Sequence, residues 1–538
     1  MNTVFLMVAL LTADAPNAAG VVRVVERVAD PFDACLWAAA DIATLKDHER
    51  PFTFYVRGGP NQDTKTAALV NLVVNKTLSQ SSAMQYPVEV AEGRLLRYNL
   101  RNLTKSHDLP RLAGVMNYLV QNEPYWHLNL TELGRAPIEV PPFVWIDGKT
   151  YTLSKSGFQS PTAELYLQLV KETGLLTPLL HAGDFSRRLL SSYEDEGGIY
   201  YDAVGFKIHG KPLNEGEIFA KLGASTAVSR TVEGDDRVGV LHSKIAGNKP
   251  RVVEAIQGAV GAVRITYDVN DGTTRGSVRR HLMYNLIDAV NRANGKEVIF
   301  ERSNNLFGYI LTDGKGALVL VGPQKLVTDH RVPEPYTANL FPPLSCIRCH
   351  ANTGGVKACP NDVPALISRD GVNIFDDLTQ RTPDDAIDRL KGLYGGGTDF
   401  DERLATSRIK YGQAVYKATG RKFDAKTAGD ELANLYGDYW YKLIDAEQQL
   451  LEYGWKARSP QAAVAALRVL MKPDSPLPIV LDEPLVYAPS SQIRQLPNSR
   501  TDHERIFGEG YKRAARYRLK DLNAAIAEAK KSSLEVAP

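Results

Sequence analysis

The amino-acid sequence predicts a multidomain α+β protein with a mixed α/β N-terminal region, a β-meander and an α-helical C-terminal region. Three observations lead to this fold class. The chain has 538 residues, enough for several domains that each bury a core. Apolar runs separated by turn residues fill 297–321, and a helical spacing of apolar residues follows from about residue 382. The composition, 44% apolar and 23% charged, is that of a globular protein.

The N-terminal half mixes both kinds of element. Residues 52–56 and 95–100 are predicted strands, and 65–76 is a predicted helix with an apolar stripe. We assign 20–137 to a first α/β domain. A group of prolines at 137, 141 and 142 separates it from a second mixed α/β segment, 138–295.

Residues 296–345 are predicted to contain a three-stranded meander. Its strands are the apolar runs 298–300, 307–311 and 317–321. The segments between them, Ser303-Asn304-Asn305 and Asp313-Gly314-Lys315-Gly316, consist of turn-forming residues.

The rest of the chain is predicted to be helical. Thr382-Pro383-Asp384-Asp385 has the residues of a helix start, and this helix should end at the glycines 395–397. Further helices are expected over 399–418, 431–453 and, with a basic solvated face, 502–531. We assign 346–455 to a helical domain and 456–538 to a helical tail.

The N-terminus has features of an export signal. Residues 4–11 are apolar, and Ala13-Asp14-Ala15 follows with small residues at alternate positions, which predicts a signal peptide over 1–19. No Lys or Arg precedes the apolar run, so a buried N-terminal strand is the alternative. No segment has the roughly twenty apolar residues of a membrane span. The net charge of +2 gives no general attraction to nucleic acid.

One motif carries chemistry: Cys346-Ile347-Arg348-Cys349-His350. The chain has only four cysteines and ten histidines, so this grouping is a poor candidate for coincidence. C-x-x-C-H is the spacing of c-type haem attachment. Two thiols three residues apart lie on one side of a helical turn and can each bind one vinyl group of the porphyrin. His350 would be the proximal axial ligand of the iron. The sequence therefore predicts one covalent haem c in a cytochrome-c-like helical region.

Other uses of these cysteines compete with haem. Cys359 could complete a zinc site with Cys346, Cys349 and His350, although adjacent residues are awkward ligands for one tetrahedral ion. Cys346 and Cys349 could instead form a disulfide or a thioredoxin-like redox pair, but no βα unit frames them. If haem takes both thiols, Cys35 and Cys359 are left over, and they either form a disulfide or stay as buried thiols.

The chain also resembles a large, mostly uncharacterised family of exported bacterial proteins with a single c-type haem site after a β-meander. The residues that carry the resemblance are Lys296–Arg302, Leu306–Gly316 and Ser345–His350, with weaker similarity near 50–52, 93–98, 123–126 and 408–419. It spans about 50–455 and implies haem attachment at Cys346, Cys349 and His350 only. Thioether formation in this group takes place outside the cytoplasm, which implies export to the periplasm or cell envelope. Pro342-Pro343 and Cys359 depart from the family pattern.

We expect one-electron transfer with a redox partner protein. A haem-based sensor or binding module and a peroxidase-type enzyme are the alternatives, and the sixth iron ligand separates them. Met471, His330 and Lys357 are the candidates for that ligand, and an open position is the fourth option. The sequence names no catalytic residue.

Overall fold

The structure is a computed structural model of the whole chain. It describes residues 25–27, 31–57, 64–121, 143–145, 149–151, 179–192, 198–208, 211–224, 237–243, 249–269, 293–322, 340–350, 354–357, 359, 362, 388, 397–420, 443–444, 446–452, 455–470, 488–489 and 522–535. The predicted signal peptide, the helix start at 382–385, His330 and Met471 lie outside these residues.

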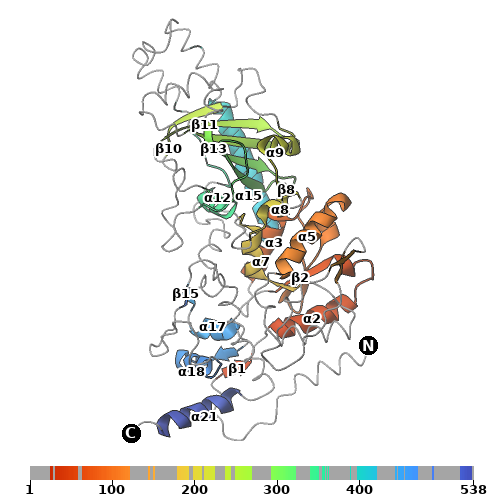
Figure 1. Cartoon of the computed structure of the whole chain (residues 1–538), viewed down its shortest axis with the longest axis vertical. Helices are drawn as coiled ribbons and strands as arrows, with labels where there is room; N and C mark the ends of the chain where they lie inside the picture. Colours follow the sequence, from red (N-terminus) through yellow and green to blue (C-terminus); the bar gives the residue numbers. More distant parts are fainter. Residues whose placement is uncertain are drawn as a thin grey trace.

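The N-terminal part is a four-stranded sheet covered by helices (Figure 1). Its strand order is β3–β4–β2–β7, and β2 pairs antiparallel with β4 and parallel with β7. This confirms the predicted strands 52–56 and 95–100 and the helix 65–76. The elements are α2 (Pro31–Ala43), β2 (Thr53–Arg57), α3 (Thr64–Thr77), β3 (Val88–Val90), β4 (Leu95–Asn99), α4 (Leu100–Leu103), α5 (Leu109–Gln121), β7 (Leu179–His181) and α7 (Ala182–Leu189), with 3₁₀ turns at η1 (Arg50–Phe52) and η2 (Ser106–Asp108).

A five-stranded antiparallel meander forms the second main sheet. Each strand pairs with the next along the chain: β10 (Arg237–Ser243), β11 (Lys249–Gln257), β12 (Ala262–Val269), β13 (Ala293–Glu301) and β14 (Phe307–Asp313). Two of the three strands predicted for 296–345 are therefore confirmed as β13 and β14. The third prediction, 317–321, is wrong. The Asp313 carboxylate accepts the backbone N–H groups of Lys315 and Ala317, and residues 317–321 form isolated bridges at Ala317 and Leu318 in place of a strand.

The period of two residues gives this sheet two different faces. Val298 and Phe300 of β13 lie in a core with α8 (Tyr200–Val204) and α9 (Glu215–Leu222). Ile299 lies in a separate core with α12 (Leu344–His350) and α15 (Gly397–Thr419). We call these the α9 face and the α12 face. Helix α15 confirms the helix predicted over 399–418.

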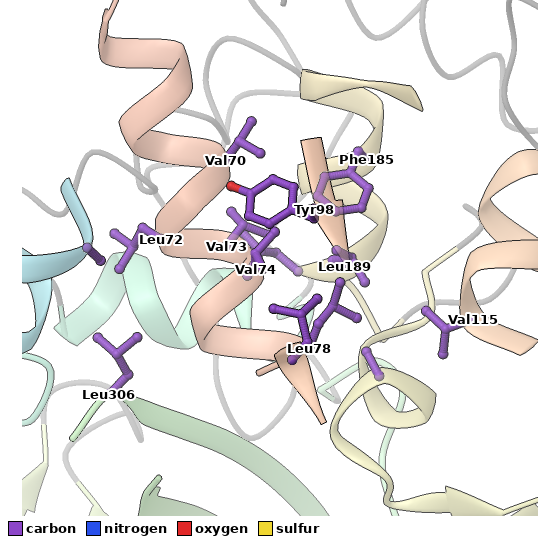
Figure 2. Packing of buried hydrophobic residues seen from close by; sticks show 14 of the residues in the cluster. Val70, Leu72, Val73, Val74, Leu78, Tyr98, Val115, Phe185, Leu189 and Leu306 are labelled. Atoms are coloured by element: carbon purple, nitrogen blue, oxygen red, sulfur yellow. The ribbon is translucent and has the colours of Figure 1, made fainter. Parts of the chain in front are cut away.

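Helix α3 connects the two sheets through one continuous core. Figure 2 shows Val70, Val73, Val74 and Leu78 on the side of α3 that meets residues of the N-terminal part, among them Tyr98, Phe185 and Leu189. Leu72 lies on the opposite side of the helix, toward Leu306 (Figure 2). The α12 face thus rests on a helix that the N-terminal sheet holds in place.

The two ends of the chain meet in a small unit of their own. Strand β1 (Val25–Arg27) pairs antiparallel with β16 (Trp455–Ala457), and Asn523 of α21 (Leu522–Glu535) hydrogen-bonds the backbone of Val25. Helices α17 (Ala446–Glu452) and α18 (Pro460–Leu470) complete it. Residues 443–444 form a strand, so the helix predicted over 431–453 is not continuous. The remaining described strands are β5 (Phe143–Trp145), β6 (Lys149–Tyr151), β8 (Lys207–Ile208), β9 (Lys211–Pro212), β15 (Leu443–Ile444) and β17 (Ala488–Pro489).

These elements confirm a mixed α and β protein with several sheets, whereas the cytochrome-like character of the C-terminal region stays a prediction. Within the described ranges, no helix combines the length and the apolar character that a bilayer crossing needs.

Candidate functional site

The C-x-x-C-H motif forms the short helix α12, which is anchored at its N-terminal end. The Leu344 backbone N–H donates to Leu190 O at 3.1 Å. Phe341 and Ser345 hydrogen-bond reciprocally, because the Phe341 N–H donates to Ser345 Oγ and the Ser345 N–H donates to Phe341 O. Leu344 and Ile347 are buried in the larger core. The helix is therefore docked firmly although it has only seven residues.

Helix α12 turns Cys346 and His350 inward and leaves Cys349 partly exposed. Cys346 is 4% exposed and His350 is 7% exposed, as expected for positions four apart on one helical face. Cys349 lies one turn beyond Cys346, and both are thiols. The structure thus places the three predicted site residues on one turn and a half of helix.

Both nitrogens of the His350 ring have hydrogen-bond partners in the protein. Nδ1 accepts the backbone N–H of Lys357 at 3.2 Å, and Nε2 lies 3.3 Å from Oε1 of Glu297 on β13. Because Nδ1 accepts, this network assigns the imidazole proton to Nε2, which donates to the carboxylate. The centroid of the Tyr309 ring, on β14, lies 6.0 Å from the centroid of the His350 imidazole.

A glycine turn after α12 delivers the Lys357 N–H group. Gly354 and Gly355 have φ values of 69° and 82°, in the left-handed region. A Cβ on Gly355 would lie 2.5 Å from Cδ2 of Phe307, so only glycine fits. The Gly355 N–H donates to His350 O, and Gly355 O accepts the Tyr309 hydroxyl at 2.8 Å. The turn is thereby tied to both α12 and β14.

The surroundings set the charge of two groups beside His350. Burial opposes ionisation of Glu297, but the contact with His350 and the nearby Arg251 and Lys357 outweigh it and lower the pKa of this carboxyl to about 2. Burial, together with the Glu297 carboxylate and Cys349, raises the pKa of the Cys346 thiol well above its ordinary value. Glu297 is therefore an anion and Cys346 a neutral thiol at neutral pH.

The α12 face carries charged side chains next to apolar ones. Arg251 of β11 pairs with Asp268 of β12 at 3.0 Å. The Arg264 guanidinium donates to Ser407 of α15 at 2.8 Å, and Ser407 donates to Glu301 of β13 at 2.5 Å. The neighbouring strands β10 and β11 add apolar side chains that join the same core, namely Val238, Val240, Val253 and Ala255. Charged and apolar groups side by side suit an amphipathic ligand better than a plain core does.

A buried lysine connects this site to α3. The Lys76 ammonium donates to the Tyr411 hydroxyl at 2.9 Å and lies 4.9 Å from the centroid of the same ring. It also lies 5.4 Å from the centroid of Tyr309. Tyr411 in turn stacks on Phe307, with centroids 4.9 Å apart. Tyr309 is therefore a neighbour both of His350 and of the Lys76 ammonium, which α3 supplies.

The other predicted residues fall in different places. The Lys357 backbone N–H contacts Nδ1 of His350, and the role of the Lys357 side chain as an iron ligand stays a prediction. The Cys359 thiol lies 3.8 Å from Lys357 O. In the described part of the chain, no three His, Cys, Asp or Glu side chains are grouped so that they could hold a metal ion. The proposed zinc set with Cys359 therefore gains no support.

Sequence reasoning missed the partners supplied by the sheet. Glu297, Tyr309 and Arg264 belong to three different strands and meet only after the meander has formed. The one available signal was a pair of acids, Glu297 and Glu301, that directly flank the predicted apolar strand 298–300.

The residues present fit a c-type haem in their chemistry. Two thiols on one turn, an adjacent imidazole and a face that mixes arginines with valines match its vinyl groups, its iron and its amphipathic body. His350 is the exception, because Glu297 and the Lys357 amide now hold its nitrogens in the tautomer opposite to the one an iron ligand needs.

Comparisons with protein-family models, with curated proteins and with solved structures find no match to this chain. Any function therefore rests on the motif and on the contacts around it.

Proposed function

We propose that this protein is an exported c-type cytochrome that carries one covalent haem c and transfers single electrons to a partner protein. The observation that carries the proposal is the C-x-x-C-H motif on one docked helix, with Cys346 and His350 turned toward a sheet face of mixed polarity. Cys346 and Cys349 would hold the cofactor, and His350 would be the proximal axial ligand. Bound there, haem would supply a one-electron couple.

His350 has to change partners to serve as that ligand. An imidazole that binds iron through Nε2 carries its proton on Nδ1, where it needs an acceptor. Here Nδ1 faces the Lys357 N–H, and Nε2 faces Glu297. The Glu297 carboxylate must leave Nε2, and the 354–357 turn must present an acceptor to Nδ1. The surrounding residues therefore set how easily the motif accepts its cofactor.

Burial of Cys346 places a second condition on loading. A thiol that is 4% exposed offers no approach to a vinyl group, and its raised pKa keeps it in the less reactive protonated form. The two thioethers would therefore form before α12 docks on the sheet. Export of the chain in an unfolded state would allow this order. The apolar run at 4–11 and the Ala13-Asp14-Ala15 site support export, with a mature N-terminus between Asp14 and Gly20.

The test is covalent attachment. The chain is produced in a periplasm that contains the c-type haem attachment machinery, and the pigment is extracted with acidic acetone. We expect the colour to stay with the protein and the mass to rise by one haem. Cys346→Ala and Cys349→Ala should each lose stable pigment, whereas the matched control Cys359→Ala should keep it. Loss of the cofactor in Cys359→Ala together with stoichiometric zinc in the purified protein would replace haem by a zinc site.

The spectrum of the same sample tests electron transfer against the other haem functions. Low-spin iron in both oxidation states, with no carbon monoxide binding, is the expected result for a carrier with six ligands. Fast carbon monoxide binding that Met471→Ala and His330→Ala leave unchanged would mean an open position. Sensing or peroxide chemistry would then replace electron transfer.

A further inference from the structure

Arg264 is a buried cation on the α12 face whose hydrogen-bonding capacity is only partly used. The residue is 3% exposed, and its Nη2 donates to Ser407 at 2.8 Å. Its guanidinium carbon lies 5.8 Å from the centroid of the Phe307 ring. The nearest carboxylate oxygen, Oε1 of Glu301, is 4.0 Å away, too far for a hydrogen bond. Ser407 stands between the two charges and donates to Glu301.

Two donors of this guanidinium, Nε and Nη1, have no acceptor among the residues that the structure describes. A buried donor without an acceptor is energetically unfavourable, and more so when the group is charged. Such groups are rare in folded proteins, and each calls for an explanation. Arg237 shows the ordinary arrangement on the same sheet, because its Nε donates to Glu254 at 3.0 Å. Arg264 therefore has the capacity to bind an anion that the protein does not provide.

The sheet register places Arg264 close to the haem motif. Arg264 lies opposite Ile299, and Thr266 lies opposite Glu297, the partner of His350. Arg264 and Glu297 are thus diagonal neighbours on one face, with Cα atoms roughly 7–8 Å apart. Burial lowers the pKa of Arg264, Glu301 and Cys359 raise it, and Arg408 lowers it again. Cys359 and a second guanidinium, that of Arg408, therefore lie near Arg264, and Arg408 is tied to the turn after α12 through Val356 O at 3.0 Å.

We propose that Arg264 binds a carboxylate through Nε and Nη1, and that the carboxylate is a propionate of the haem held by Cys346 and Cys349. This inference rests on the proposed function. Haem carries two propionates at the porphyrin edge away from the vinyl groups, and Arg264 is a diagonal neighbour of Glu297, which contacts His350 of the motif. Guanidinium is the side chain that best matches a carboxylate. A small carboxylic acid from solution offers the same chemistry and is the other source.

A contact of this kind has an electrochemical consequence. A positive charge beside the cofactor disfavours the ferric form, which carries one more positive charge than the ferrous form. Removing the charge of Arg264 should therefore lower the reduction potential. The free propionate should also vibrate differently once its partner is gone.

The test uses purified holoprotein of the wild type, of Arg264→Met and of the matched control Arg237→Met, which removes an equally buried arginine from the opposite face. Mass spectrometry first establishes that all three carry one haem. We then expect Arg264→Met to shift the redox equilibrium about tenfold toward the ferric form, or 59 mV for one electron. The propionate bending band in the resonance Raman spectrum should shift as well, and Arg237→Met should change neither quantity. Arg264→Lys, which keeps a charge beside Glu301, replaces Arg264→Met if that variant does not fold, and should recover the potential only in part.

The source of the carboxylate is decided by a second measurement, the melting temperature with and without sodium benzoate. If Arg264→Met matches Arg237→Met in potential and Raman spectrum while benzoate stabilises the wild type and not Arg264→Met, the carboxylate comes from solution and the propionate assignment is wrong. If benzoate has no such selective effect either, Arg264 is not a carboxylate site. A wild-type protein without covalent haem overturns the proposed function, and the benzoate measurement alone then decides the role of Arg264.

Discussion

The two faces of the five-stranded sheet differ in how completely their buried charges are paired. On the α9 face, Arg237 pairs with Glu254 at 3.0 Å, and the Lys296 ammonium lies 2.6 Å from the nearest carboxylate oxygen of Glu215. Around these pairs the side chains are apolar, as Ile265 and Ile310 illustrate. The α12 face also holds one ion pair, between Arg251 and Asp268. In addition it places the Glu297 carboxylate against the His350 imidazole and leaves two donors of the Arg264 guanidinium without an acceptor among the described residues.

This difference in charge pairing distinguishes the α9 face, a structural core, from the α12 face, which carries the candidate site. A buried charge that is paired within the protein already has its counter-ion, so it needs no ligand. Charges left partly satisfied next to reactive side chains identify candidate sites for ligands and protons. The sheet thus separates the α9 face, where Arg237 and Lys296 are paired with carboxylates, from the α12 face, where two donors of Arg264 have no acceptor among the described residues. The following variants test that contrast, from the largest expected effect to the smallest.

Ile310→Ala tests whether the α9 face is a core and nothing else. Ile310 is fully buried among apolar side chains of this face, and its truncation leaves a cavity. We expect the free energy of unfolding to fall by about 2–5 kcal/mol, measured by urea denaturation. Covalent haem per folded molecule should not change. A normal stability combined with poor haem attachment would mean that this face also serves the site.

Gly355→Ala tests the turn that supports His350 on the α12 face. The left-handed backbone costs about 1–2 kcal/mol for alanine, and the contact of its Cβ with Phe307 adds to that cost. We expect a total loss of about 2–4 kcal/mol in thermal or urea unfolding. Gly420→Ala is the matched control, because Gly420 has a φ of 68° and nothing within 4 Å of an added Cβ. Equal losses in the two variants would show that the turn is not packed against β14.

Glu297→Gln tests whether the charge of the Glu297 carboxylate on the α12 face makes the stability of the protein depend on pH. The pKa of Glu297 is about 2 in the folded protein and has an ordinary value of 4.5. A carboxyl with a lowered pKa contributes stability that is present above pH 4.5 and is lost as the pH falls toward 2. In haem-free protein we therefore expect Glu297→Gln to be less stable by about 2–3 kcal/mol at pH 7.

Urea unfolding of both chains between pH 7 and pH 3 measures this difference. The two stabilities should approach each other as the pH falls below 4.5. A constant difference over the whole range would mean that the amide loses packing or a hydrogen bond and that the charge of Glu297 contributes nothing.

Asn214→Ala gives the smallest effect and belongs to the α9 face. The Asn214 side chain caps α9 by accepting the Glu217 N–H at 3.0 Å, and the Glu217 carboxylate accepts the Asn214 N–H in return. Loss of this capping box should lower the unfolding free energy by about 1 kcal/mol. The haem content and the reduction potential should stay at their wild-type values. A changed potential would show that the two faces are coupled.

Local patterns predicted a good part of this fold. The alternation and turn residues gave β13 and β14, the apolar stripe gave α3, and the helical spacing gave α15. The predictions failed where a local pattern met a tertiary constraint. Residues 317–321 are apolar enough for a strand, but the turn closed by the Asp313 side chain leaves them with isolated bridges. Residues 443–444 fit a helical period and pair with β17 instead.

The site shows the same division. Cys346, Cys349 and His350 are neighbours in sequence, so their spacing was enough to find them. Glu297 and Arg264 reach the motif only through strand register, which depends on residues far apart in the chain. The sequence also does not show whether an acidic side chain in a strand points toward water or toward an imidazole. Strand register and side-chain direction are properties of the folded sheet, and they cannot be derived from a single sequence.

The strand β1 is made early in synthesis and has to wait for its partners. Its neighbour β16 and the side chain of Asn523 come from the far end of the chain, and Val25 and Asn523 are separated by 498 residues. At about 5–20 residues per second, synthesis of that interval takes on the order of half a minute or more. Closing so long a loop is slow compared with local pairing. Until β16 and Asn523 have been made, β1 lacks these two partners, and a strand edge without a partner can pair with another chain.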